Sequence, residues 1–293
     1  MTTKDKSRNQ QVFDSFVLFV NNYSLFVALG AVSTSFFFLN YYQQPISFVF
    51  LWLMGTTTWV IFTADHILDA EHLREKAITA RHKAHFKYKT ILTYLVALII
   101  GSNAFLVWIN RYELFVMKGA LLGVLMVMYL VFIKFKQSKH LIILSKEILV
   151  AVGATIGMCI LPGFISPITW TFPHFLLITI FFLINLANIL TFSRFDLKSD
   201  IDNKMTSLVY QLGYAQSSRI IFNLLNICFL LGAIWMFSFA GFYKVKGALA
   251  LVLMLNILAI INLKYYAFKE KEYYRFWGDF IYLIPGMTVF LHL

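Results

Sequence analysis

The recurrence of long apolar runs constrains the fold more than any other feature of the sequence. Each run has about 20 residues, enough for one helix to cross ~30 Å of hydrocarbon. The nine runs lie near 15–39, 46–66, 89–110, 114–133, 141–165, 172–193, 219–241, 246–267 and 276–292. Only 13% of the residues are charged, which is typical of membrane proteins. The sequence therefore predicts an all-α, polytopic membrane protein, with residues 1–293 forming a single bundle of nine transmembrane helices.

The distribution of Lys and Arg predicts how this bundle is oriented. The first run is longer than the apolar part of a signal peptide, so we expect a retained helix. With a cytoplasmic N-terminus, 21 of the 25 cations fall on the cytoplasmic side, as retention of Lys and Arg there requires. We expect an integral membrane protein of the bacterial inner membrane. The net charge of +11 then reflects orientation and attraction to anionic lipid headgroups, so no nucleic-acid partner is expected.

Two pairs of carboxylates follow the second and the sixth apolar runs. Asp65 and Asp69 form the first pair, and Asp196 and Asp200 form the second. A spacing of four places both members of a pair on one helix face. Four helices separate the pairs, so both should emerge on the cytoplasmic side. The chain thus divides into two halves, at about 15–134 and 141–267, and a last helix at about 276–292.

Four carboxylates at one membrane surface predict a metal and phosphate site. Ionisable groups at a membrane boundary are functional candidates by default. Carboxylate oxygens suit Mg²⁺ better than Zn²⁺, and Mg²⁺ commonly keeps phosphate oxygens as ligands. Neighbouring cations could contact the remaining phosphate oxygens. These candidate diphosphate-binding residues are Arg81, Lys83, Lys198 and Lys204.

The two carboxylate motifs resemble those of the UbiA superfamily of intramembrane prenyltransferases. That family's first motif reads N-D-x-x-D-x-x-x-D, and the corresponding stretch here is IFTADHILD. Asp65 and Asp69 match its last two acids, whereas Ile61 and Phe62 stand in the places of Asn and Asp. The second motif is matched more fully, by Asp196, Asp200, Ser207, Leu208 and Gly213.

The resemblance implies a nine-helix bundle that binds the Mg²⁺ complex of a prenyl diphosphate at its cytoplasmic side. It implies Mg²⁺-dependent transfer of the prenyl group, within the membrane, to a small acceptor such as an aromatic compound or quinone precursor. The catalytic and metal-binding residues would be Asp65, Asp69, Asp196 and Asp200. The expected partners are the prenyl diphosphate donor, the acceptor and membrane lipids.

The incomplete first motif leaves its ligand set open. The site could hold fewer ions, use a histidine as a ligand, or be degenerate. His72 lies three residues beyond Asp69 and seven beyond Asp65, on their helix face, which favours it over His66. His82 and His85 are consistent with either polar loop residues or functional ones.

Two asparagines are weaker candidates for the substrate pocket. Asn185 lies eleven residues before Asp196, on nearly the same face and about 16 Å deeper, and Asn188 lies close to that face. Amides inside membrane helices also commonly hydrogen-bond to a neighbouring helix.

Two other functions are compatible with parts of the sequence. A membrane transporter could use intramembrane acids to bind coupling ions, although such sites lie near the bilayer midplane, where this sequence places no acidic pair. A catalytically silent relative could keep the bundle as a binding protein, and the residues at Ile61 and Phe62 favour this alternative.

Overall fold

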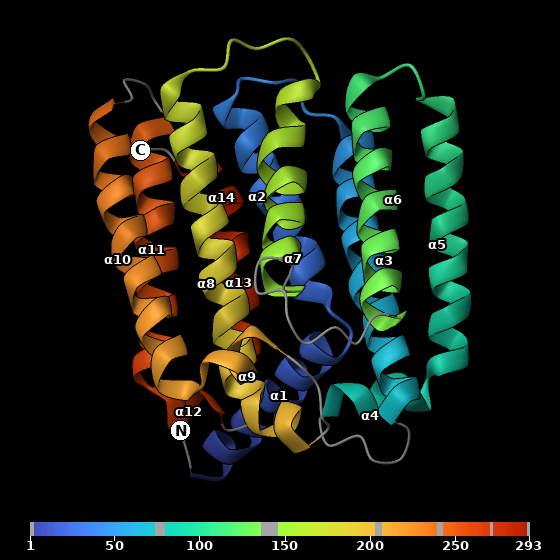
Figure 1. Ribbon diagram of the computed structural model, residues 1–293, viewed down its shortest axis with the longest axis vertical. Helices are drawn as coiled ribbons and strands as arrows, with labels where there is room; N and C mark the ends of the chain where they lie inside the picture. Colours follow the sequence, from blue (N-terminus) through green and yellow to red (C-terminus); the bar gives the residue numbers. More distant parts are fainter. Residues whose placement is uncertain are drawn as a thin grey trace.

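The computed structural model of the protein describes residues 3–73, 80–135, 146–202, 207–238, 243–269 and 272–291. These residues form helices and connecting turns, and no strand occurs among them. The helices stand side by side in one bundle (Figure 1). The prediction of an all-α protein is confirmed.

The first half of the bundle contains six helices. They are α1 (Thr3–Asn22), α2 (Leu25–Tyr41), α3 (Phe48–Leu73), α4 (Ala80–Lys87), α5 (Lys89–Ile109) and α6 (Leu114–Phe135). The short helix α4 packs against α3. It lies across the lower end of the bundle in Figure 1.

The second half begins with α7 (Lys146–Thr155), which continues into a π-helical turn and a 3-10 turn, Ile156–Ile160 and Leu161–Phe164. The remaining α-helices are α8 (Phe172–Asp202), α9 (Leu208–Leu212), α10 (Tyr214–Ser238), α11 (Tyr243–Leu263), α12 (Tyr265–Lys269), α13 (Tyr273–Phe280) and α14 (Ile284–Val289). A 3-10 turn, Ile281–Leu283, joins α13 to α14.

Six helices of the described residues are long and apolar enough to cross a membrane. These candidate spans are Phe48–Glu71, Lys89–Ile109, Lys146–Phe164, Phe172–Asp202, Tyr214–Ser238 and Lys244–Leu263. A seventh is added if Gln11–Asn22 and α2 count as one bent span. The chain is therefore a polytopic helical membrane protein. Nine spans and a cytoplasmic N-terminus stay predictions.

The first apolar run is not one continuous helix. Ser24, between α1 and α2, has φ 54° and ψ 31°, in the left-handed region. The two helices meet at an angle of 74°. The Tyr23 carbonyl at this break accepts a hydrogen bond of 3.0 Å from the Trp59 indole, which satisfies a backbone group that the bend leaves without a helical partner.

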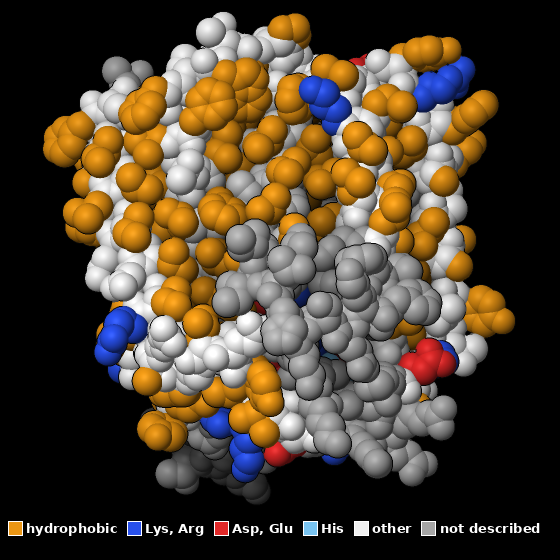
Figure 2. Space-filling model, viewed as in Figure 1, with side chains coloured by type: hydrophobic (Ala, Val, Ile, Leu, Met, Phe, Trp, Pro, Cys, Tyr) orange, Lys and Arg blue, Asp and Glu red, His pale blue; other side chains and the backbone are white. Residues whose placement is uncertain are grey.

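The core lies between α2, α8, α10 and α11. Its largest fully buried side chains include Phe37, Phe38, Phe181, Trp235 and Met254. In contrast, only 6% of the apolar window of α5 is buried, against 61% for α8. Hydrophobic side chains are spread over the upper part of the visible face (Figure 2). An apolar surface of this extent fits contact with lipid rather than water.

Candidate functional site

The second carboxylate motif is held by residues from α13. The Asp196 carboxylate, on α8, forms an ion pair with the Arg275 guanidinium. The Tyr274 hydroxyl donates a hydrogen bond of 2.5 Å to the other Asp196 oxygen. Arg275 also lies 3.5 Å from the Glu272 carboxylate. Because the Arg275 side chain is only 7% exposed, this ion pair is well shielded from water.

Asp200 lies one helical turn further along α8, beside the start of α9. The Ser207 side chain lies close enough to the Asp200 carboxylate to interact with it. It also caps α9 by accepting a hydrogen bond of 3.1 Å from the Tyr210 N–H. Gly213 ends α9 with φ 78°, a conformation that glycine adopts without strain. The motif residues Ser207 and Gly213 thus shape the turn that faces Asp200.

The first carboxylate motif is held by the start of α7. Lys146 Nζ lies 2.8 Å from an Asp65 carboxylate oxygen. It is also close enough to interact electrostatically with Asp69. Asp65 is buried, whereas the Lys146 side chain is 43% exposed. This ion pair is therefore partly open to solvent.

The next residue along α7 contacts the second motif instead. Glu147 is buried, and one of its oxygens accepts a hydrogen bond of 2.8 Å from the Leu208 backbone N–H. The Ser193 hydroxyl donates a longer hydrogen bond of 3.4 Å to the same oxygen. Two consecutive residues, Lys146 and Glu147, therefore connect α7 to both carboxylate motifs.

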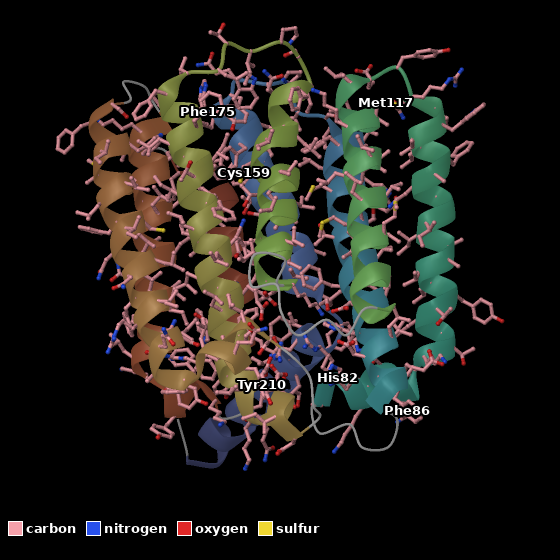
Figure 3. All side chains as sticks on the ribbon, in the orientation of Figure 1. His82, Phe86, Met117, Cys159, Phe175 and Tyr210 are labelled. Carbon is pink, nitrogen blue, oxygen red and sulfur yellow. The ribbon has the colours of Figure 1, made fainter. Side chains whose placement is uncertain are left out.

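Arg81, on α4, lies between the two motifs. It interacts electrostatically with His66 of the first half and with Asp196 and Arg275 of the second. Side chains from α3, α4, α7, α8 and α13 thus converge at one end of the bundle. That end is the lower one in Figure 3, where His82 and Tyr210 are labelled.

A histidine cluster adjoins the first carboxylate pair. One ligand atom each from His66, Asp69 and His82 lies within 4.8 Å of the others. Burial, and then the nearby Arg81 and Arg275 cations, lower the pKa of His82 to about 3. The imidazole of His82 is therefore neutral at physiological pH. The sequence pattern favoured His72 over His66, but the side chain of His72 falls outside the described residues.

The structure describes three of the four cations that the sequence predicted to contact phosphate. Arg81 lies in the site, whereas Lys83 and Lys198 are exposed. Lys204 lies outside the described residues. The structure adds Lys146 and Arg275, which the sequence analysis did not select. Both stand at the edge of an apolar run, and that position is the one sequence signal that could have indicated them.

The two asparagine candidates connect helices within the core. The Asn185 amide donates a hydrogen bond of 2.8 Å to the Thr155 hydroxyl of α7. Asn188 lies close to Tyr282, in the 3-10 turn after α13. Both side chains are buried, and in each the amide oxygen has no hydrogen-bond partner among the described residues. They are deep polar groups, as predicted, with clear packing roles.

The fold and the site define a class of protein: a helical membrane bundle in which two carboxylate motifs lie at the same end. Among solved structures, the chain is similar to one described as the apo structure of a UbiA homolog from Aeropyrum pernix K1. That similarity has a TM-score of 0.59 and covers 89% of this chain and 96% of the other, at 11% sequence identity. No protein-family model matches the sequence, and no curated protein gives a significant match. The chain has a UbiA-like fold, as the sequence motifs suggested.

Proposed function

We propose that this protein is a Mg²⁺-dependent intramembrane prenyltransferase. It would transfer the prenyl group of a prenyl diphosphate to a small acceptor, with aromatic compounds and quinone precursors as the expected class. One observation carries this proposal. Two carboxylate pairs, 131 positions apart in the chain, lie at one end of the bundle with three cations, Arg81, Lys146 and Arg275, close to them.

The second carboxylate motif fits Mg²⁺ by its donor chemistry. Asp196 and Asp200 are near enough to affect each other electrostatically, and Glu147 is close to Asp200. All three offer only oxygen atoms, the ligands that Mg²⁺ prefers. Asp196 and Asp200 would hold the ion with Asp65 and Asp69 facing them. When bound, Mg²⁺ supplies charge neutralisation for the departing diphosphate.

The side chains of the chain itself would position the donor. Arg81 and Arg275 carry planar guanidinium groups that can each contact two phosphate oxygens. Lys146 is half-exposed and can turn from Asp65 toward an incoming phosphate. Breaking the allylic C–O bond leaves positive charge on the prenyl chain and negative charge on the diphosphate. The acceptor then bonds to the allylic carbon and loses a proton, while the surrounding bundle excludes water.

Calorimetry with a prenyl thiolodiphosphate, a slowly reacting donor analogue, tests this proposal directly. We expect the purified protein to bind the analogue in the presence of Mg²⁺ and much more weakly without it. The variants Asp196→Asn and Asp200→Asn should each lose Mg²⁺-dependent binding. Asp202→Asn is the matched control, because Asp202 is exposed at the end of the same helix and should leave binding unchanged.

Two outcomes would overturn the proposal. Binding that does not depend on Mg²⁺ or on either aspartate would exclude the metal-dependent donor site. A folded, monodisperse protein that does not bind the analogue would favour the alternative of a silent relative or transporter. The replacement of two motif residues by Ile61 and Phe62 would then account for the loss.

The number and direction of the membrane spans are part of the same proposal. The chain would cross the bacterial inner membrane nine times, with its N-terminus and both carboxylate motifs in the cytoplasm. Single cysteines introduced at Lys83 and Arg111, both exposed, should react with membrane-impermeant thiol reagents from opposite sides. Cys159 and Cys228 are buried, so they should stay unlabelled in this assay.

A further inference from the structure

His66 is a buried imidazole without an evident structural purpose. His66 directly follows Asp65 in the first motif, and the residue is only 4% exposed. Neither ring nitrogen has a hydrogen-bond partner among the described residues. Burying polar nitrogens without hydrogen-bond partners destabilises the folded state. The unpartnered ring nitrogens of His66 therefore suggest that a ligand binds to this side chain.

Two further groups face His66 in a pattern that suits metal binding. Asp69 lies one turn further along α3, and His82 comes from α4, with ligand atoms of all three within 4.8 Å. Two ligands of one Zn²⁺ ion are at most about 4 Å apart. Small side-chain rotations would therefore bring all three groups onto a single ion. Because two different helices supply the ligands, bound metal would also join α4 to α3.

His85 supplies an independent observation at the same place. Its ring centroid lies 5.2 Å from that of His66. The Nδ1 atom is 3.0 Å from the Arg81 carbonyl, to which it can only donate a proton. This hydrogen bond fixes the tautomer and leaves a lone pair on Nε2. Nε2 is itself buried without a partner among the described residues, so a third imidazole nitrogen, and a fourth candidate ligand, borders the cluster.

The donor atoms determine which class of ion fits. Imidazole nitrogen suits Zn²⁺ and other late first-row divalent ions, whereas Mg²⁺ prefers oxygen ligands. Two imidazoles with one carboxylate is a ligand set found in catalytic zinc sites with an open fourth position. The second motif, with Asp196, Asp200 and Glu147, offers only oxygen. The two halves are therefore chemically different.

The surrounding charges also permit a cation here. Arg81 and Lys146 lie close to His66 and would repel a metal ion. The Asp65 carboxylate compensates Lys146 through its ion pair, and Asp69 itself would contribute a negative ligand. Asp196 lies close to Arg81 and interacts favourably with it. Arg275, which is near His82, forms an ion pair with the same Asp196. Each of these three cations thus has a carboxylate close by.

We infer that His66, Asp69 and His82 form a second metal site, which takes a Zn²⁺-class divalent ion rather than Mg²⁺. The site shares Asp69 with the proposed prenyltransferase function. It does not depend on that function, because metal binding can be measured without any prenyl substrate. The bound ion would hold α4, and with it Arg81, against the end of α3.

Cobalt binding to the untagged, metal-stripped protein tests the inference. Co²⁺ substitutes for Zn²⁺ and gives visible d–d absorption when nitrogen ligands surround it. We expect one Co²⁺ per chain, displaced by an equimolar amount of Zn²⁺ but not by a large excess of Mg²⁺. His82→Gln and Asp69→Asn should each weaken Co²⁺ binding by about 10- to 100-fold or more.

His174→Ala is the matched control for this experiment. His174 caps the start of α8 by accepting a hydrogen bond of 3.1 Å from the Thr171 N–H. Its neighbour Phe175 and His82 lie at opposite ends of the bundle (Figure 3). The control variant should therefore bind Co²⁺ like the unchanged protein. Size-exclusion profiles and thermal unfolding would confirm that each variant is folded.

Three results would overturn the inference. They are the absence of protein-dependent cobalt absorption, full binding by a folded His82→Gln variant, and equal displacement by Mg²⁺ and Zn²⁺. Failure of prenyl diphosphate binding would not bear on it, since no donor is present in the assay. Conversely, loss of cobalt binding in His82→Gln with Mg²⁺-dependent donor binding intact would separate the two metal sites.

Discussion

Asp65 and Asp196 occupy corresponding places in the two halves, yet their ion pairs differ in exposure and origin. Asp196 pairs with Arg275, whose side chain is 7% exposed, and Tyr274 donates a further hydrogen bond. Asp65 pairs with Lys146, whose side chain is 43% exposed. A shielded guanidinium pair fixes its carboxylate, whereas a solvent-accessible ammonium can move away from its partner. The second half therefore provides the fixed part of the site, and the first half provides the adjustable part.

The largest expected effect comes from breaking the shielded pair. Asp196→Ala should lower the free energy of unfolding by about 3–5 kcal/mol, because the buried Arg275 would keep only its longer contact with Glu272. Thermal unfolding in detergent micelles measures this. The double variant Asp196→Ala, Arg275→Met should regain much of the loss. A single variant as stable as the unchanged protein would show that the pair is not shielded.

The contact between α7 and the second motif should give an intermediate effect. Glu147→Ala removes the acceptor of the Leu208 N–H, a buried donor, so we expect a loss of about 1–3 kcal/mol. Glu147→Gln keeps an oxygen at the same place and should lose less. Unfolding curves of the two variants give the comparison. Equal losses would mean that the negative charge, rather than the hydrogen bond, provides the stabilisation.

The exposed pair should matter more for ligand binding than for stability. Lys146→Met should change the free energy of unfolding by no more than about 1 kcal/mol, as for other partly exposed ion pairs. Its affinity for the prenyl thiolodiphosphate should fall clearly in calorimetry. A large stability loss with unchanged affinity would reverse the assignment of fixed and adjustable halves.

The smallest effect is expected within the core. Asn185→Ala removes one hydrogen bond between α8 and α7, worth about 0.6 kcal/mol in a membrane protein. If Asn185 only packs the helices, Thr155→Val should match it in unfolding measurements, and both should bind the donor analogue normally. Weaker binding by Asn185→Ala alone would place this amide in the substrate pocket.

Sequence patterns were sufficient to predict those features of the site that depend on residue spacing within one helix and on the order of the helices. The spacing of four predicted that each aspartate pair shares a helix face, and helix parity predicted that both pairs lie at the same end. The structure brings them to the same end through Arg81 and α7. The long apolar runs at 46–66 and 172–193 likewise predicted α3 and α8, and each helix continues from its apolar run into a polar C-terminal turn.

The remaining parts depend on packing between distant segments. Lys146 and Arg275 are ordinary cations at the edges of apolar runs, and only the docking of α7 and α13 gives them carboxylate partners. The choice between His66 and His72 rested on the face of α3 alone. The structure places His66 beside His82 because α4 folds back against α3, an arrangement that helix periodicity cannot reveal. The break at Ser24 had no proline or glycine to indicate it.

Helix α1 affects the order in which the molecule can be assembled. The Tyr273 hydroxyl is hydrogen-bonded to Asp14, and the Asn21 amide donates a hydrogen bond of 3.2 Å to the Glu272 carbonyl. The partners are more than 250 positions apart in the chain. Because a ribosome makes the N-terminus first, α1 must wait through nearly the whole of synthesis for α13. A ribosome-bound chain that stops before residue 272 lacks α13 and therefore Arg275, the ion-pair partner of Asp196. Its proposed diphosphate site should be unfinished, however many of its membrane spans have already inserted.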